Sequence, residues 1–176
     1  MAAKRLRKGH SYRQTERPFT RISKNRKKAY IKTRPQHKIA RFVMGNKTKT
    51  FSHKLDLYIK GQIQIRHNAL EAARQVINRR LTKLGAQEFK LVLRVYPHQI
   101  QRENKMLGGQ HSDRIQMGMK KSYGKPTNVA AQVKVGQDIF TAYVNEKNLI
   151  AAKNALMAAK AKLPYKVGVT ISDNIK

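Results

Sequence analysis

The sequence predicts an α+β fold, a two-layer α/β sandwich in which two amphipathic helices cover a mixed β-sheet. Apolar residues alternate with a period of two in several short segments, as they do in half-buried strands. In two longer segments they recur at steps of three and four, as they do on helices with one apolar face. Because each helix has only one face to bury, we expect both to pack on a sheet and not to form a bundle.

The first predicted strand spans 53–59, where every second residue is Leu or Ile. Gly61 interrupts it, and the alternation resumes at 63–65. The spacing of Leu, Ile and Ala then predicts a helix over about 66–84. Gly85 follows where a left-handed C-terminal cap is expected. The domain therefore begins with a strand followed by a helix.

The rest of the domain repeats these two patterns. Four further segments have the strand period, at 89–95, 129–135, 139–144 and 167–171. A second helical stripe spans about 145–163, where Asn145 can cap the start and Pro164 ends the helix. The predicted order is β, α, β, β, β, α, β, which fits an α+β sandwich.

The composition indicates a protein that needs an anionic partner. The 176 residues include 39 Lys and Arg against 9 Asp and Glu, a net charge of +30, and this charge repels itself unless a polyanion neutralises it. An apolar share of 40% is enough for one core. The absence of Cys excludes disulfides, thiolate nucleophiles and zinc ribbons. We find no apolar run long enough to cross a membrane and no secretory signal, so we expect an intracellular chain.

Residues 1–50 form a predicted basic N-terminal arm, and residues 51–176 form the sandwich domain. The arm has 17 basic residues and one acid, Glu16, and it lacks apolar periodicity, so we expect it to have no core of its own. Aromatic residues among the cations favour an arm that packs while its charges contact phosphates. The alternative is a solvated tail. The RNA-binding candidates in the arm are Arg5, Arg7, Lys8, Tyr12, Arg13, Arg17, Arg21, Lys24, Arg26, Lys27, Lys28, Arg34, Lys38 and Arg41.

A long basic loop is predicted at 97–128, between two well-patterned strands. Its length of about thirty residues exceeds the usual connection of about 4 to 6 residues. It carries four glycines and six cations against two acids. A loop of this length without secondary structure is usually functional, so we predict that it is a binding element.

Catalytic and metal-binding patterns are absent from the sequence. The six histidines lack metal-ligand spacing, and the carboxylates form no evident acid/base pair, so we expect no metal and no enzyme activity. The segment from Gly118 to Lys125 departs from a phosphate-binding loop, because five residues separate its glycines and Pro126 replaces the Ser or Thr that would hold magnesium.

Three functions remain open for such a chain. Arms and loops rich in cations and aromatic residues favour binding to folded RNA, where shape and stacking are recognised together. An RNA-modifying enzyme would need an acid/base pair in its long loop. An architectural DNA-compacting protein would need a dimer surface or a minor-groove wedge. Neither requirement is met by a pattern in the sequence, so RNA binding is the favoured function.

Several sequence strings, in order along nearly the whole chain, resemble one family of large-subunit ribosomal proteins. These strings are Tyr12–Arg13, Arg17–Arg21, Lys38–Ile39, Met44–Asn46, Ala69–Arg74, Leu93–His98, Arg102–Leu107, Asp113–Met119 and Gly124–Pro126. They resemble the L-ten-e family, the archaeal and eukaryotic counterpart of bacterial L-sixteen. Two departures are Ser11, where the family has Cys, and the polar stretch Gly109–Ser112, where the family has small residues.

The resemblance implies a structural constituent of the large (50S) subunit in the cytoplasmic ribosome. It implies rRNA binding near the peptidyl-transferase centre and central protuberance, a β-hammerhead-like element, and a loop that helps position tRNA acceptor ends. Peptide-bond chemistry would belong to rRNA. Further implied partners are neighbouring ribosomal proteins and late assembly factors, and no cofactor is implied beyond Mg²⁺ as an rRNA counterion. The implied contacts of the loop are Arg102, Asn104, Lys105, Arg114, Lys120, Lys121 and Lys125.

Overall fold

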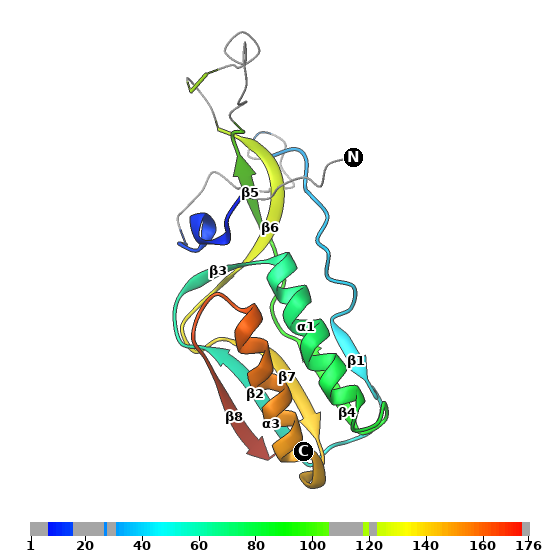
Figure 1. The fold of residues 1–176 in the computed structure, drawn as a ribbon. Helices are drawn as coiled ribbons and strands as arrows, with labels where there is room; N and C mark the ends of the chain where they lie inside the picture. The colour runs from blue at the N-terminus through cyan, green and yellow to red at the C-terminus, as the bar shows by residue number, and fades with distance from the viewer. Residues whose placement is uncertain (1–6, 16–26, 28–30, 106–117, 120–122, 174–176) are drawn as a thin grey trace.

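The computed structural model describes residues 7–15, 27, 31–105, 118–119 and 123–173 (Figure 1). Its elements follow in this order: the 3-10 turn η1 (Gly9–Tyr12), β1 (Val43–Gly45), β2 (His53–Ile59), β3 (Ile63–Arg66), α1 (His67–Thr82), β4 (Phe89–Leu93), β5 (Gln99–Glu103), β6 (Lys125–Val133), β7 (Asp138–Val144), the 3-10 turn η3 (Glu146–Asn148), α3 (Leu149–Ala158), the 3-10 turn η4 (Ala159–Lys162) and β8 (Val167–Asp173).

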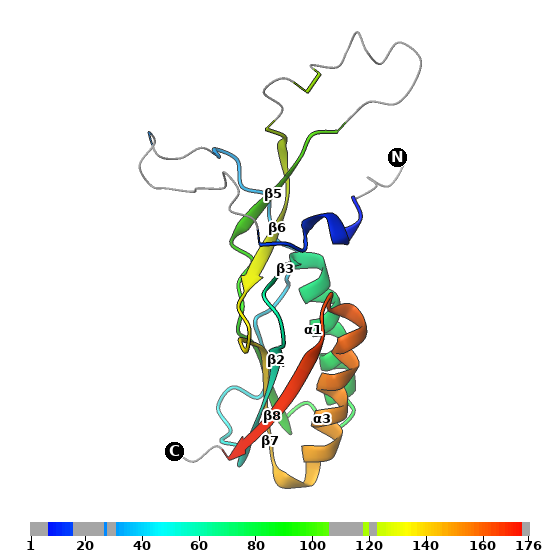
Figure 2. The ribbon, with the colours of Figure 1, turned by 90° about the vertical axis from the view of Figure 1, so that its left-hand side faces the viewer.

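A five-stranded sheet and two helices make up the part of the molecule that we call the body. The strands lie in the order β1-β4-β7-β2-β8, and Figure 2 shows α1 and α3 together on one side of them. Leu55, Leu57 and Ile59 of β2 are fully buried and belong to the main core. The apolar alternation of the strands therefore meets the apolar stripes of the helices, and the predicted α+β sandwich with two helices is confirmed.

Helix α1 follows its predicted stripe. Leu70, Ala73, Ile77 and Leu81 have no exposed surface, and they belong to the main core beneath the helix. The predicted Gly85 has a positive φ of 114° just after the helix, a backbone conformation in which glycine is favoured. The start and the end of α1 lie within two residues of the predicted bounds.

Helix α3 is shorter than predicted. The α-helical part covers ten residues, with one 3-10 turn before it and another after it, so the predicted helix over 145–163 is a composite. The buried face carries Ala152, Ala155 and Leu156 of α3, followed by Ala159 of η4. Small Ala side chains let the helix contact α1, β2, β7 and β8.

The sheet is antiparallel at every pairing found among the described residues, so the predicted mixed sheet is wrong. Helix α1 carries the chain back across the sheet, so β2 and β4 run in the same direction. Strand β7 lies between them and runs opposite to both. Apolar periodicity reports which face of a strand is buried but does not report the direction of its neighbour.

A second, three-stranded antiparallel sheet has the order β3-β6-β5. Strands β5 and β6 rise from the body beyond the start of α1 (Figure 1), and we call these two strands the ribbon. The predicted loop at 97–128 therefore contains all of β5 and the first residues of β6. The sequence did not reveal β5 because its five residues include a single apolar side chain, Ile100.

Strand β1 lies inside the predicted N-terminal arm but pairs with β4 at the edge of the sheet. It ends at Gly45, which has a φ of 79°. A Cβ atom there would lie 2.1 Å from the carbonyl oxygen of Phe89, so only glycine fits. Among the arm residues that the structure describes, Ile31, Ile39 and Met44 are buried. They pack in cores shared with the rest of the chain: Ile39 and Met44 belong to the main core, and Ile31 packs with Ile100 and Val129.

Candidate nucleic-acid interface

The ribbon is held between the body and the arm. Strand β6 pairs with β3 on one side and with β5 on the other, so the base of the ribbon continues directly into the strand that precedes α1. Near the base, Ile100 and Val129 form a small cluster with Ile31 of the arm. The arm thus supplies part of the packing that fixes the ribbon.

The start of the arm adds to the free edge of β3. The backbone N–H of Gln64 donates to the carbonyl oxygen of Arg13 over 2.9 Å. The side-chain amide of Gln64 donates to the carbonyl oxygen of Tyr12 over 3.0 Å. Arg66 donates to the carbonyl oxygen of Arg7 over 3.0 Å. An edge strand leaves backbone groups unpaired, and the arm uses them as its anchor.

His67, at the first turn of α1, ties the arm to the helix and to β6. The backbone N–H of Lys38 donates to its Nδ1 over 3.1 Å, so the ring proton is assigned to Nε2, which lies 3.4 Å from Oδ1 of Asn128. Burial lowers the pKa of His67, the hydrogen bond with Asn128 opposes this effect, and nearby Lys38 reinforces it. The neutral ring therefore joins three segments that are distant in sequence.

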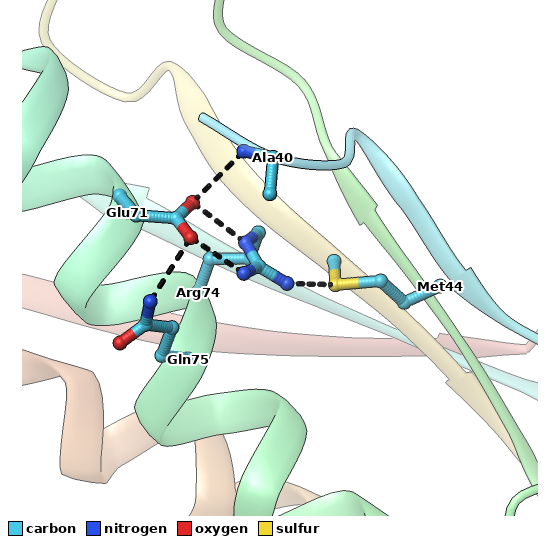
Figure 3. A network of polar contacts seen from close by, with 5 residues as sticks. All are labelled: Ala40, Met44, Glu71, Arg74 and Gln75. Carbon is cyan, nitrogen blue, oxygen red and sulfur yellow. Dashed lines mark hydrogen bonds and ion pairs between the residues drawn. The ribbon is translucent and has the colours of Figure 1, made fainter. Parts of the chain in front are cut away.

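A second tie joins the arm to the middle of α1 (Figure 3). The carboxylate of Glu71 accepts hydrogen bonds from Nε and Nη2 of Arg74 over 2.7 and 2.6 Å, and from the backbone N–H of Ala40 over 3.4 Å. Nη1 of Arg74 contacts the sulfur of Met44 at 2.9 Å. The hydrogen bonds from Arg74 lower the pKa of Glu71, against the effect of burial. Residues 40–44 are thereby fixed on α1.

An aromatic cluster joins the arm to the segment between β4 and β5. Phe42 and Tyr96 are stacked, with ring centroids 5.7 Å apart, and His37 meets both rings edge-on. The guanidinium of Arg34 lies 5.4 Å from the centroid of Tyr96. Tyr96 keeps 46% of its surface exposed. Exposed aromatic rings beside a cation are suitable for stacking with nucleic-acid bases.

The structure describes eight of the predicted arm contacts. Seven of them are exposed cations: Arg7, Lys8, Arg13, Lys27, Arg34, Lys38 and Arg41. The eighth, Tyr12, is half-buried against the ribbon, where its hydroxyl donates to the carbonyl oxygen of Arg102 over 3.4 Å. Six candidates lie outside the described residues: Arg5, Arg17, Arg21, Lys24, Arg26 and Lys28.

Four of the predicted loop contacts are described. Asn104, Lys105 and Lys125 are exposed near the far end of the ribbon, and Arg102 is half-buried. The predicted contacts that lie outside the described residues are Arg114, Lys120 and Lys121. The described arm and loop candidates therefore do not all lie at the same end of the molecule. Lys38 and Arg41 lie beside α1, away from the far end of the ribbon.

Negative charge is concentrated in the body. Of the seven carboxylates that the structure describes, only Glu103 lies on the ribbon. Four of the others form ion pairs, with the partners Lys49–Glu88, His53–Asp173, Lys54–Asp56 and Arg74–Glu71. The surface of the arm and ribbon is therefore strongly positive and suited to an extended polyanion. Within the described residues there is no group of three side chains that could hold a metal ion.

Sequence reasoning missed the side chains that hold this surface in place. Gln64, His67 and Glu71 anchor the arm, yet none of them has a local motif that would indicate its role. The string Ala69–Arg74 includes the Glu71–Arg74 pair at the i, i+3 spacing of an ion pair on a helix. That spacing was the one available signal, and it did not reveal the contact with the arm.

Comparison with known proteins identifies the family. The family described as "Ribosomal protein L16p/L10e" matches residues 18–170, which is most of the chain. The chain belongs to this family. The large ribosomal subunit protein uL16 of Methanococcus aeolicus is 44% identical over 168 residues, which cover 94% of each chain. The uL16 proteins of Archaeoglobus fulgidus (41% over 161 residues, 91% of this chain and 89% of the relative) and Sulfolobus acidocaldarius (42% over 171 residues, 95% and 94%) are similar.

As a member of the L16p/L10e family, the chain is a structural protein of the large ribosomal subunit and not an enzyme. The predictions of this family, of a ribosomal function in translation and of a place in the cytoplasmic ribosome are confirmed. The alternative of an RNA-modifying enzyme is set aside. None of the helices that the structure describes is long and apolar enough to cross a membrane.

Proposed function

We propose that the arm and the ribbon together form the rRNA-binding surface of this L16p/L10e protein, and that the body is their scaffold. The main support for this proposal is the separation of positive and negative side chains within the molecule. Exposed cations line the arm and the ribbon, whereas most of the described carboxylates lie in the body, four of them in ion pairs. Phosphates that contact these cations release condensed counterions, which drives binding.

The geometry favours binding to folded RNA over binding to a single strand. The ties at Gln64, His67 and Glu71 hold the described parts of the arm along α1 and β3, so the cations of those parts form a surface of fixed shape. A preorganised surface loses less conformational entropy when it binds. It can therefore match phosphates that the RNA fold brings together from separate helices.

The family resemblance supports a finer assignment of the ribbon. We assign the β-hammerhead-like element to the three-stranded sheet β3-β6-β5, and we place the far end of the ribbon toward tRNA acceptor ends near the peptidyl-transferase centre. Asn104, Lys105 and Lys125 are the described side chains exposed there. In this proposal rRNA performs the chemistry, Mg²⁺ acts as an rRNA counterion, and neighbouring proteins and late assembly factors contact the remaining surface.

The salt dependence of binding tests the rRNA surface. The test variant carries Lys38→Gln and Arg41→Gln, two exposed arm cations, and the control carries Lys153→Gln and Lys160→Gln, two exposed cations in and just after α3. Affinity for a large-subunit rRNA transcript is measured over a salt series. The arm variant should reduce the slope of log K against log salt by about 1.5, at about 0.7 to 0.9 per phosphate contact, and the control should not change it. Equal slopes for both variants would contradict the proposal.

A further inference from the structure

A cavity of about 370 Å³ lies between the arm and the segment that joins β4 to β5. The arm contributes Arg34, Pro35, Gln36 and His37, and the joining segment contributes Tyr96. Arg34 and Gln36 are exposed, and Tyr96 keeps 46% of its surface exposed, so these side chains can be reached from solvent. The volume is many times the ~30 Å³ that a water molecule occupies in the liquid, so the cavity has room for a much larger group.

Two planar groups border this cavity. The guanidinium of Arg34 lies over the ring of Tyr96, 5.4 Å from its centroid. The ring of Tyr96 is also stacked on Phe42, with an angle of 24° between the ring planes, and His37 meets its edge. Aromatic rings and guanidinium planes are the surfaces on which proteins stack unpaired RNA bases.

The backbone holds both planar groups in place. Arg34 and Tyr96 each precede a proline, and a residue before proline is restricted to extended backbone conformations. Nη2 of Arg34 donates to the carbonyl oxygen of Pro97 over 3.5 Å. The backbone N–H of Leu93 donates to the carbonyl oxygen of Phe42 over 2.8 Å, which ties the ring stack to β4. A base that enters the cavity therefore meets an ordered surface, and its binding costs less conformational entropy.

The side chains of this cavity favour a base over a phosphate. Among the described side chains that line it, Arg34 is the one Lys or Arg. The face of an aromatic ring carries partial negative charge, so Tyr96 does not attract phosphate oxygens. A base gains from both surfaces, because bases stack on rings and on guanidinium planes alike. Stacking tolerates any base, since every base has a π-face.

We propose that this cavity binds one unpaired base of rRNA, packed against the guanidinium of Arg34 and the ring of Tyr96. The inference rests on the proposed rRNA-binding function and adds a stacking site to a surface otherwise governed by charge. Arg34 acts here through its plane as well as its charge, and a lysine reproduces only the charge. Tyr96 becomes an RNA contact that lies outside the arm and the ribbon.

The test uses two RNA hairpins with equal numbers of phosphates. One carries a single bulged adenosine, and the other carries an abasic nucleotide at the same position. Each is titrated into the full-length protein, into Tyr96→Leu and into Arg34→Lys. The matched controls are Tyr165→Leu, at a tyrosine with 45% of its surface exposed, and Arg80→Lys, at an exposed position near the end of α1. Thermal melting shows which variants fold as the parent does, and Arg34→Lys, at an exposed position, decides the test if Tyr96→Leu does not fold.

The parent and both controls should bind the hairpin with the bulged base about tenfold more tightly than the abasic hairpin. Arg34→Lys and Tyr96→Leu should each lower this ratio to about threefold or less, because each removes one stacking surface. A parent with equal affinity for the two hairpins would overturn the stacking site and leave the charged surface intact. A tenfold ratio that persists in Arg34→Lys would also overturn it, because Arg34 would then act through its charge alone. Failure of the parent to bind either hairpin would overturn the proposed function as well.

Discussion

The body and the ribbon are both built from antiparallel strands, but they differ in the side chains that hold them. Strand β2 buries Leu55, Leu57 and Ile59 in a core covered by two helices. Strand β5 has Ile100 as its one apolar residue and depends on a cluster of three buried side chains. The body is therefore stabilised mainly by apolar burial within the chain, whereas the arm and ribbon depend more on polar ties and, in our proposal, on phosphates.

The largest expected effect concerns the two cores. Leu70→Ala in α1 removes a side chain with no exposed surface and should lower the free energy of unfolding by about 2 to 5 kcal/mol. Ile100→Ala should fall at the lower end of this range, at about 2 kcal/mol, because its small cluster can collapse around the gap. Urea denaturation of both variants measures the difference. Equal losses would show that the ribbon is as deeply integrated as the body.

Removing one partner of the Glu71–Arg74 pair should have the next largest effect. Arg74→Met leaves a mostly buried carboxylate without its guanidinium and should lower the free energy of unfolding by about 2 kcal/mol. The double variant with Glu71→Gln should recover part of this loss. Urea denaturation of the single and double variants checks both effects. If the double variant is as unstable as Arg74→Met, the loss comes from packing against Met44 and not from the unpaired charge.

A smaller effect should appear with pH. The pKa of His67 is lowered in the folded protein, chiefly by burial, so the unfolded chain takes up the proton first as pH falls. The contribution of the neutral ring is complete above the unfolded pKa of about 6.5 and is lost as pH falls through the lower, folded pKa. Melting at pH 7.5 and 5.5 should show a smaller decrease for His67→Gln than for the parent. An equal decrease in melting temperature for both proteins would show that His67 does not cause this pH dependence.

The smallest effect on stability should come from the far end of the ribbon. Arg102→Ser should change the free energy of unfolding by no more than about 0.5 kcal/mol, since the side chain is half-buried and the bond from Tyr12 goes to its backbone. The same variant should weaken rRNA binding. Thermal melting and filter binding to an rRNA transcript are measured on the same preparation of the variant. A variant that melts well below the parent would show that Arg102 is a structural residue and not an RNA contact.

The same contrast explains how much of the fold was predictable. Apolar stripes gave the correct faces of α1 and β2, because burial imposes a period on a sequence. Strand β5 was missed because neighbouring Ile100 and Gln101 are both buried next to a bulge, which breaks the period of two. Strand β1 was missed because three residues at a sheet edge are too few to show a period.

The candidate site was predictable in composition but not in geometry. Cations of the arm and loop could be selected from the sequence because charge is visible there. The ties through Gln64, His67 and Glu71 join residues 29 to 52 positions apart, and no local pattern records such contacts. Tyr96 was missed for the same reason, since its position beside Arg34 exists only in the folded chain.

The division of labour between scaffold and binding surface is tested most directly by the reactivity of lysines. The free protein and its complex with a large-subunit rRNA transcript are acetylated briefly, and modified lysines are quantified by mass spectrometry. Exposed Lys38, Lys105 and Lys125 of the arm and ribbon should lose reactivity in the complex, while Lys153 and Lys160, exposed in and just after α3, should retain it. Protection of the α3 lysines with continued reactivity of the other three would contradict the account.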